Sequence, residues 1–228
     1  MPKKFTEIMM LSPDLFFSYV ASIRYGYKDQ QGNLHFQDEE NFTVHDYSFS
    51  SSEEVVENNC AWCWEIAELT KQYCIRNSIP YHAWFMEYKS EELHQTHTQV
   101  FMLYQEKWCP TPDNSLGIKL GEHGFSDLNK SVQWFKGFFT DYLKAVLKDK
   151  YDEKKFLLKE YICEFPKGIT DNEYLNRIIK VACMDSQMHP HCHHRRRAAH
   201  RRILCIIMHR LYGALPDWNR GYPITEAL

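Results

Sequence analysis

Apolar residues recur at helical spacing across residues 63–77. The positions that lie three and four residues apart are Ile66, Leu69 and Tyr73. The serines at 50–52 lie upstream and favour helix N-termini, and Pro80 follows the end of the stretch. The pattern therefore predicts an amphipathic helix that begins at Cys63.

Alternating patterns predict an antiparallel sheet after this helix. Residues 81–88 and 97–104 favour strands, and a polar loop separates them. In 97–104 both alternating sets are rich in β-favouring residues, which is typical of a strand covered on both faces. A short turn then leads to residues 108–111, which are expected to pair with 97–104 as a hairpin.

The rest of the chain is expected to add helices, a hairpin and one more strand. Ser12 and Pro13 predict a helix through residue 22, since proline suits the first helical turn. The other expected elements are a hairpin at 25–36 that turns at 31–33, a surface loop at 37–52, a helical stretch at 125–147 and a strand at 156–165. The aromatic stripe within 134–142 is expected to be core, although it could also line a substrate groove. The predicted fold class is α+β.

Composition sets the broad class of protein. The 228 residues favour one main domain, predicted at 1–170, followed by a helical, His/Arg-rich extension at 171–228. A hydrophobic fraction of 44% is enough for a substantial core, and a net charge of −3 gives no overall attraction to nucleic acid or membranes. The longest wholly apolar run, 203–208, is far shorter than a membrane span. With no secretory signal at the N-terminus, the eight cysteines predict reduced thiols and a cytoplasmic protein.

Three residues carry the candidate chemistry. Cys63, His97 and Asp113 follow one another in the order nucleophile, base and orienting acid, as in a thiol-based acyl-transfer site. A cysteine in the first turn of a helix gains thiolate character from the helix dipole. Taken alone, Cys63 could equally be a buried structural cysteine, and His97 could be a surface histidine.

The surrounding motifs resemble a known superfamily. Cys-Trp-Glu-x-Ala-Glu-Leu from Cys63, the tripeptide Ser78-Ile79-Pro80 and the strand from His97 to Trp108 are similar to the transglutaminase-like superfamily of papain-fold enzymes. The closer likeness is to an uncharacterised bacterial subgroup with a Gly-Thr-Cys-Trp-Asp-type motif. The segments that match this subgroup are Tyr25-Gly26-Tyr27 and Gly117-Ile118, and the resemblance spans roughly residues 12–170.

The resemblance implies a papain-like, transglutaminase-like core with a helix packed on an antiparallel sheet. It implies a Cys-His-Asp triad that acts on amide or isopeptide bonds of protein or peptide-like substrates, by hydrolysis, deamidation or amine transfer. Neither a metal nor an organic cofactor is expected. Trp62 and Trp64 are expected to contact substrate, and Trp62 replaces a small residue of the family pattern. Asp113 lies further from the strand tryptophan than is usual in the family, so Asn114 is the alternative orienting group.

Two other functions remain open. A non-catalytic binding module would keep the fold without turnover, and the bulk of Trp62 beside the cysteine favours this reading. Cys60 and Cys63 also form a Cys-x-x-Cys motif at a helix start, as in thiol redox proteins. Residues 53–59 are polar, however, and do not suggest the buried strand that precedes such a motif in the redox fold.

The C-terminal section has its own composition. The histidines and Cys192 within 189–194, together with Cys183, offer zinc-ligand types but lack paired ligand spacing. A basic patch able to meet nucleic-acid phosphates consists of Arg195, Arg196, Arg197, Arg201 and Arg202. The favoured interpretation is a helix over about 195–211 whose apolar face docks on the domain, with no nucleic acid or metal bound. The oligomeric state is left open.

Overall fold

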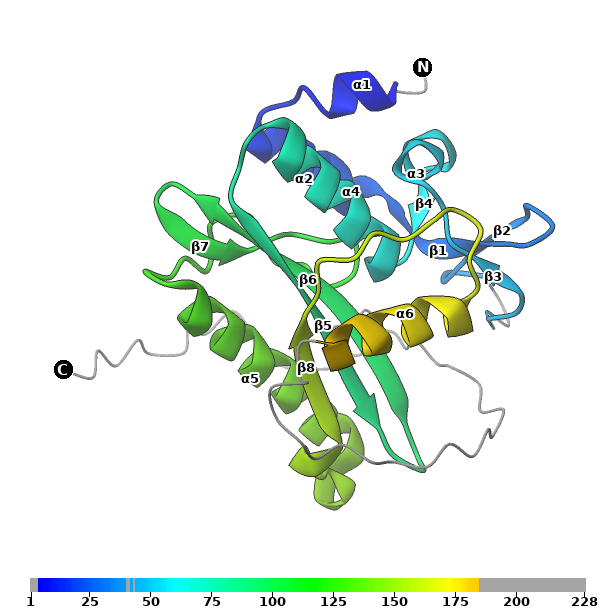
Figure 1. Ribbon diagram of the computed structural model, residues 1–228, viewed down its shortest axis with the longest axis vertical. Helices are drawn as coiled ribbons and strands as arrows, with labels where there is room; N and C mark the ends of the chain where they lie inside the picture. The colour runs from blue at the N-terminus through cyan, green and yellow to red at the C-terminus, as the bar shows by residue number, and fades with distance from the viewer. Residues whose placement is uncertain (1–3, 40–41, 43, 185–228) are drawn as a thin grey trace.

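The computed structural model describes residues 4–39, 42 and 44–184 and has a mixed α+β architecture with two sheets (Figure 1). The first sheet has the order β2-β1-β3, and β4 pairs with β1 in parallel. Its strands are β1 (Arg24–Asp29), β2 (Leu34–Phe36), β3 (Tyr47–Ser48) and β4 (Cys60–Ala61). The second sheet has the order β7-β6-β5-β8 and is antiparallel throughout. Its strands are β5 (Tyr81–Lys89), β6 (His94–Tyr104), β7 (Lys107–Pro110) and β8 (Phe156–Glu160).

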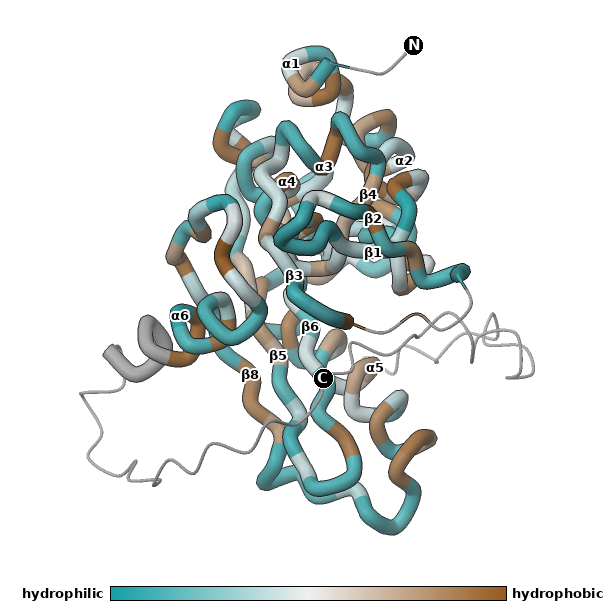
Figure 2. The backbone as a smooth tube through the Cα atoms, turned by 90° about the vertical axis from the view of Figure 1, so that its right-hand side faces the viewer, coloured by the Kyte–Doolittle hydropathy of each residue, from teal (hydrophilic) through white to brown (hydrophobic). Residues whose placement is uncertain are grey.

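Helices connect and cover these sheets. The α-helices are α1 (Phe5–Ile8), α2 (Pro13–Ser22), α3 (Ser52–Asn58), α4 (Cys63–Arg76), α5 (Leu128–Leu147) and α6 (Asp171–Met184). Two 3-10 turns, η1 (Lys148–Lys150) and η2 (Glu153–Lys155), join α5 to β8. Apolar and polar residues alternate along α5 (Figure 2), as expected of a helix with one buried face. No helix in the described part of the chain is both long and apolar enough to cross a membrane.

Different helices cover the two faces of the second sheet. Val100 of β6 packs with Cys63 and Ala67 of α4. Phe101, the next residue, packs with Phe135 and other residues of α5. Successive side chains of a strand point to opposite faces, so α4 covers one face and α5 the other. The prediction that this strand is covered on both sides is confirmed.

The last helix of the described residues, α6, packs on the same core cluster as the start of α4. Tyr174 and Ile178 of α6 belong to the buried cluster that contains Trp62, Cys63 and Trp64. The backbone of the preceding segment is tied to the chain near β3, because the N–H of Phe49 donates to the carbonyl of Ile169 at 2.9 Å. The described part of the predicted C-terminal extension is therefore attached to the domain through buried aromatic contacts. The predicted helix at 195–211 lies outside the described residues.

Several predicted elements are confirmed with small shifts in their bounds. The helix that begins at Cys63, the helix with proline in its first turn and the hairpin that turns at 31–33 are all present. The hairpin between the strands that contain His97 and Trp108 is also present. The aromatic stripe is largely core, since Phe135 and Phe139 are buried.

Other expectations about local structure were wrong. The serine run that was expected to cap the helix of Cys63 instead caps α3, where Ser51 accepts from the N–H of Glu54 at 3.3 Å. The expected loop at 37–52 contains β3, whose two residues pair with β1. The strand expected at 156–165 ends at Glu160. Of these segments, β3 gains its strand structure from pairing with β1 rather than from an alternating pattern.

Candidate functional site

Cys63 is the first residue of α4, and the fold around it explains why the helix begins there. Its N-cap residue, Trp62, has an extended backbone with φ −91° and ψ 173°. The Glu65 carboxylate accepts from the Trp62 N–H at 3.0 Å and so satisfies a donor that a helix start leaves unpaired. This hydrogen bond from the third residue of the helix back to its N-cap fixes the first turn of α4 and the position of the cysteine within it.

Glu65 is a buried carboxyl group that helps to set the position of this turn. Besides Trp62, the hydroxyl of Tyr47 donates to it, and the N–H of Ser50 approaches at 3.5 Å. Burial raises the pKa of Glu65 to about 7, and the Tyr47 hydroxyl and the backbone donors oppose this rise. The carboxyl group of Glu65, two residues after Cys63 in α4, therefore titrates near neutral pH.

His97 lies in β6 on the face of the second sheet that α5 covers. It is directly opposite Met86 of β5, and its ring stacks on Phe135 with a centroid separation of 5.7 Å. Phe139, one turn further along α5, stacks at 6.1 Å. Only 5% of the residue is exposed. Aromatic packing thus restricts the orientation of the imidazole.

Asp113 reaches His97 from the loop that follows β7. Its Oδ2 atom lies 3.6 Å from His97 Nε2, and 6% of the residue is exposed. Its Oδ1 atom accepts from the N–H groups of Ser115 at 2.8 Å and Leu116 at 2.7 Å. The Ser115 hydroxyl donates to Oδ2 at 3.0 Å. These donors hold the carboxylate in place beside the imidazole.

The other candidate for the orienting group, Asn114, has a different partner. Its side-chain N–H donates to the carbonyl of Ala61 at 2.9 Å. Asp113 therefore faces His97, while its neighbour ties the same loop to the residues just before Cys63. Of the two alternatives, the structure places Asp113 beside the ring.

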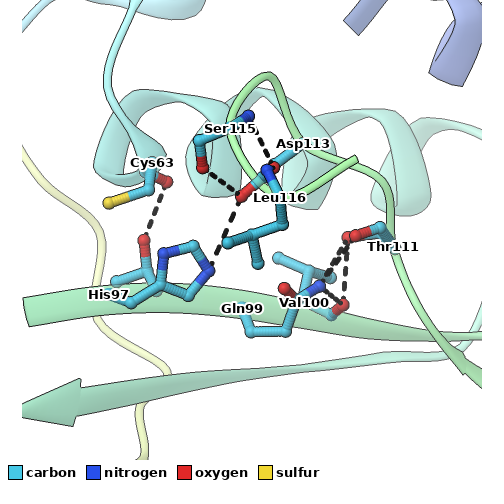
Figure 3. Close-up of polar contacts among 9 residues, drawn as sticks. Cys63, His97, Gln99, Val100, Thr111, Asp113, Ser115 and Leu116 are labelled. Atoms are coloured by element: carbon cyan, nitrogen blue, oxygen red, sulfur yellow. Dashed lines mark hydrogen bonds and ion pairs between the residues drawn. The ribbon is translucent and has the colours of Figure 1, made fainter. Parts of the chain in front are cut away.

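A backbone contact joins α4 to β6 at the candidate site. Thr98, the residue after His97, donates from Oγ1 to the carbonyl of Cys63 at 2.7 Å. β7 pairs with residues 101–104 of β6. Beside the residues of β6 that precede Phe101, the strand edge borders the loop that carries Asp113. Figure 3 shows the His97 ring between the side chain of Cys63 and the carboxylate of Asp113. The three predicted residues thus gather at one edge of β6, although α4 and α5 cover opposite faces of the sheet.

The electrostatic setting of His97 follows from its burial. Burial lowers the pKa of His97, and the Asp113 carboxylate opposes that change, as does the side chain of Gln99. A buried imidazole with a lowered pKa is neutral at neutral pH. It is thus in the form that can accept a proton.

Gln99 also braces the loop that carries Asp113. Its side-chain N–H donates to the carbonyl of Thr111 at 2.9 Å and to that of Val100 at 2.8 Å. The N–H of Thr111 donates in turn to the Val100 carbonyl at 2.9 Å. The loop therefore leaves the sheet at a fixed position two residues before the carboxylate.

The two predicted substrate-contacting tryptophans are both fully buried. The ring of Trp62 stacks on Tyr47 at 5.1 Å, and the ring of Trp64 stacks on Tyr174 at 4.1 Å. Both rings pack in the core cluster that contains Cys63. They form the aromatic surroundings of the cysteine, and their contact with a substrate stays a prediction.

Segment 161–178 covers this part of α4. Tyr161, Tyr174 and Ile178 are buried in the cluster of Cys63, and the cysteine itself is 1% exposed. The chain reaches this position because the N–H of Tyr161 donates to the carbonyl of Ala83 at 2.9 Å, directly after β8 ends. Segment 161–178 therefore helps to shield Cys63 from solvent.

Cys60 contributes little nucleophilic character to the site. The thiols of Cys60 and Cys63 are not joined by a disulfide. Burial raises the pKa of Cys60 to about 12, and the Glu65 carboxylate adds to the rise. A thiol that holds its proton so strongly is a poor partner for thiol–disulfide exchange.

Sequence reasoning missed several residues of this neighbourhood. Thr98 and Gln99 carried a usable signal, because they directly follow His97 in the strand. Tyr161 and Tyr174 carried none, since only tertiary packing brings them to Cys63. Among the described residues, no group of three His, Cys, Asp or Glu side chains is arranged to hold a metal ion. The residues of 189–194 that were weighed as zinc ligands and the five arginines lie outside the described residues.

A scan of the chain against protein-family models found no match, and a search of curated proteins found none either.

Proposed function

We propose that the chain catalyses thiol-dependent acyl transfer on amide or isopeptide bonds, with Cys63 as nucleophile, His97 as proton acceptor and donor, and Asp113 as orienting group. The observation that carries the proposal is the buried contact of 3.6 Å between His97 and Asp113, at the strand edge where Thr98 binds the backbone of Cys63. The α+β fold with α4 packed on an antiparallel sheet is compatible with a transglutaminase-like, papain-like core. That closer assignment is part of the proposal.

The first half of the reaction forms a thioester. The proton of the Cys63 thiol passes to His97, and the sulfur forms a bond to the carbonyl carbon while the π electron pair moves to oxygen. When the tetrahedral adduct collapses, the carbon–nitrogen bond breaks. The leaving amine takes its proton from His97, and Asp113 stabilises the imidazolium in the interval.

The second half releases the acyl group. Water or an amine attacks the thioester carbonyl and gives a proton to His97. The carbon–sulfur bond then breaks, and the sulfur leaves as a thiolate that recovers a proton from the imidazolium. Every step uses side-chain groups and the two substrates. Protein or peptide-like amides fit this chemistry.

The test is covalent trapping by an acyl donor. The full chain is incubated with p-nitrophenyl acetate, release of p-nitrophenolate is followed, and peptide mapping by mass spectrometry locates the acetyl group. We expect a burst of product and an acetyl group on Cys63. His97→Ala should slow the burst by about 100-fold or more, since general base catalysis contributes at least that much. His82→Ala, a half-exposed histidine of β5, is the control and should leave the rate unchanged.

Two results would contradict the proposal. One is the absence of an acetyl group on Cys63 while the folded protein is intact. The other is an equal burst rate in the His97→Ala variant and the unmodified chain.

A second candidate function is a non-catalytic binding module that retains the fold. The 1% exposure of Cys63, between two fully buried tryptophans, favours it. Such a module would show no acyl burst, and Cys63→Ala would leave its ligand binding and its stability nearly unchanged. The trapping experiment therefore separates the two candidates.

A further inference from the structure

Gln99 is a buried amide beside the ring of His97. The two residues are two positions apart in β6, so their side chains point to the same face of the second sheet, the one that α5 covers. Gln99 is 2% exposed. Figure 3 shows its side chain between the His97 ring and Thr111, on the side of the ring that carries Nε2. The amide thus borders the ring nitrogen that faces Asp113.

Hydrogen-bond partners fix the orientation of the Gln99 amide. Its nitrogen lies 2.8 Å from the carbonyl oxygen of Val100 and 2.9 Å from that of Thr111. A backbone carbonyl only accepts hydrogen bonds, so the end of the amide that meets both carbonyls is the NH2 group. These two acceptors use both of its N–H bonds. The side-chain oxygen, Oε1, is therefore turned away from the two carbonyls.

Oε1 of Gln99 and Nε2 of His97 are two buried polar atoms on one face of the strand. Neither has a hydrogen bond to any other described residue, and the contact of Nε2 with Asp113 is a longer one of 3.6 Å. Burial lowers the pKa of His97, and the Asp113 carboxylate and the Gln99 side chain, as a hydrogen-bond partner, oppose that change. A partner that favours the protonated ring is one whose oxygen accepts from a ring N–H.

Asp113 leaves room for a second acceptor at Nε2. Its distance of 3.6 Å from Nε2 is longer than the roughly 2.7–3.2 Å of an N–H···O hydrogen bond. Its two oxygens already accept three hydrogen bonds, two from Ser115 and one from Leu116. The face of the ring packs on Phe135, which has no polar group to offer. Asp113 and Gln99 therefore supply the acceptors for the Nε2 proton together.

We propose that Gln99 is a positioning residue that acts through His97: its side-chain oxygen shares the Nε2 proton of the neutral imidazole with Asp113, so that Nδ1 takes the proton of the Cys63 thiol. This inference rests on the proposed function for the step at Cys63. A neutral imidazole carries its proton on one nitrogen and accepts at the other. Two acceptors at Nε2 favour the Nε2–H tautomer, and Nδ1 lies on the side of the ring toward Cys63 (Figure 3).

The proton transfer is balanced within these groups. The S–H bond of Cys63 breaks and its electron pair stays on sulfur, while the lone pair of Nδ1 forms the new N–H bond. The imidazolium that results carries a positive charge, and its Nε2–H becomes a stronger donor. Both acceptors therefore bind the charged ring more strongly than the neutral ring.

The first test determines the tautomer directly. The full chain is labelled with ¹⁵N-histidine, and two-bond proton–nitrogen NMR spectra at neutral pH show which ring nitrogen of His97 carries the proton. The signals that disappear in His97→Ala identify this ring. We expect the proton on Nε2. This measurement needs no variant of Gln99, so the proposal stays testable even if such a variant does not fold.

The second test removes the amide with Gln99→Met, which keeps the length of the side chain. We expect a smaller fraction of the Nε2–H tautomer and acetylation of Cys63 by p-nitrophenyl acetate that is slower by about ten-fold, as for the loss of one hydrogen bond in the transition state. Because Gln99 raises the pKa of His97, the acidic limb of the rate profile should shift to lower pH. A residue that only braced the loop would not change the tautomer.

Thr111→Val is the matched control. It removes the hydroxyl that donates to the Val100 carbonyl at 3.0 Å and accepts from the Gln99 amide at 3.3 Å, but it keeps the backbone carbonyl of Thr111. The loop loses part of its brace, while Oε1 of Gln99 is untouched. The tautomer of His97 and the position of the acidic limb should therefore stay as in the unmodified chain.

Three outcomes would overturn the inference. They are a proton on Nδ1 in the unmodified chain, an unchanged tautomer and acidic limb in Gln99→Met, and a change in Thr111→Val as large as that in Gln99→Met. Failure of the proposed function gives a different result. The tautomer then responds to Gln99→Met as expected, but the unmodified chain gives no acetyl burst, so the step at Cys63 is wrong while Gln99 still sets the tautomer.

Discussion

Thr98 donates a hydrogen bond of 2.7 Å to the carbonyl of Cys63, so the residue beside the candidate base holds the first residue of α4. The bond joins two segments that are 35 positions apart in sequence. It lies on the face of the sheet that α4 covers, while His97 starts from the other face and reaches the same strand edge. The relative position of Cys63 and the His97 imidazole therefore depends on a hydrogen bond between α4 and β6.

Thr98→Val should weaken this connection without changing the shape of the core. Valine has nearly the volume of threonine but leaves the buried carbonyl of Cys63 without that donor. We expect a loss of about 1–3 kcal/mol in the free energy of unfolding, measured by urea denaturation. We also expect the acetylation rate of Cys63 to fall about ten-fold, because even a small displacement of the cysteine relative to the imidazole is costly in catalysis.

The matched control is Thr70→Val in α4. Thr70 is fully buried, and its hydroxyl has no partner among the described residues, so valine should keep or raise stability. If the two valine variants lose equal stability, the bond from Thr98 does not hold the helix start.

Asp113→Asn separates the charge of the orienting group from its hydrogen bonds. Asparagine retains an oxygen for the N–H groups of Ser115 and Leu116, so the loop should keep its shape. The carboxylate charge beside His97 Nε2 is lost. We expect acetylation of Cys63 to slow by about 100-fold or more, since loss of that charge disfavours both the useful tautomer and the imidazolium.

The charge loss should also alter the pH dependence of the reaction. Asp113 raises the pKa of His97 against the larger effect of burial, so its removal should lower that pKa further. The acidic limb of the rate profile should then shift to lower pH. Asn114→Ala serves as the comparison, since Asn114 binds Ala61 instead. A larger rate loss in that variant would identify Asn114 as the more important residue.

Much of the scaffold was predictable because its elements have strong periodic patterns. The helix from Cys63 and the strand with His97 each carry enough apolar residues to specify their covered faces. The position of Asp113 was less accessible. Its approach to His97 depends on a loop fixed by Gln99 and Thr111, and side-chain bonds to backbone carbonyls leave no periodic signal.

The start of α4 shows a different limit of sequence reasoning. The serines upstream are good capping residues, and they do cap a helix, but that helix is α3. Trp62 occupies the N-cap of α4, although tryptophan is not a preferred capping residue. The Glu65 carboxylate and aromatic packing compensate for this choice. The serine cap therefore belongs to the helix that directly follows it, through hydrogen bonds between residues three apart in sequence.

Glu65→Gln should change how stability depends on pH. The folded carboxyl has a pKa of about 7 against an ordinary value of 4.5, so between these values the folded chain binds more protons than the unfolded chain. Stability from this group is therefore full below pH 4.5 and is lost as pH rises to 7, by a total on the order of 3 kcal/mol. Glutamine does not titrate and should remove this decline.

The measurement is the melting temperature from pH 4.5 to 8 for both proteins. His97 acts in the opposite direction: its lowered pKa reduces stability as pH falls below the ordinary histidine value of about 6.5. Because His97 is present in both proteins, the difference between the two curves isolates Glu65. Parallel curves would show that Glu65 does not titrate in this range.

Tyr174→Ala should open the cover over Cys63. The ring of Tyr174 is fully buried and stacks on Trp64, so its removal leaves a cavity between α6 and α4. We expect a loss of about 3–5 kcal/mol of stability. Alkylation of Cys63 by iodoacetamide under native conditions should accelerate by ten-fold or more, beyond what the loss of global stability alone produces.

Tyr88→Ala is the control that separates local from global opening. Tyr88 is also fully buried, but it packs in the cluster of α5 on the other face of the sheet. Its loss should reduce global stability by a similar amount. If Cys63 reacts through local movement of segment 161–178, only Tyr174→Ala raises the rate strongly at low denaturant. Equal acceleration in both variants would mean that the cysteine is reached through global unfolding and that the segment does not act as a separate cover.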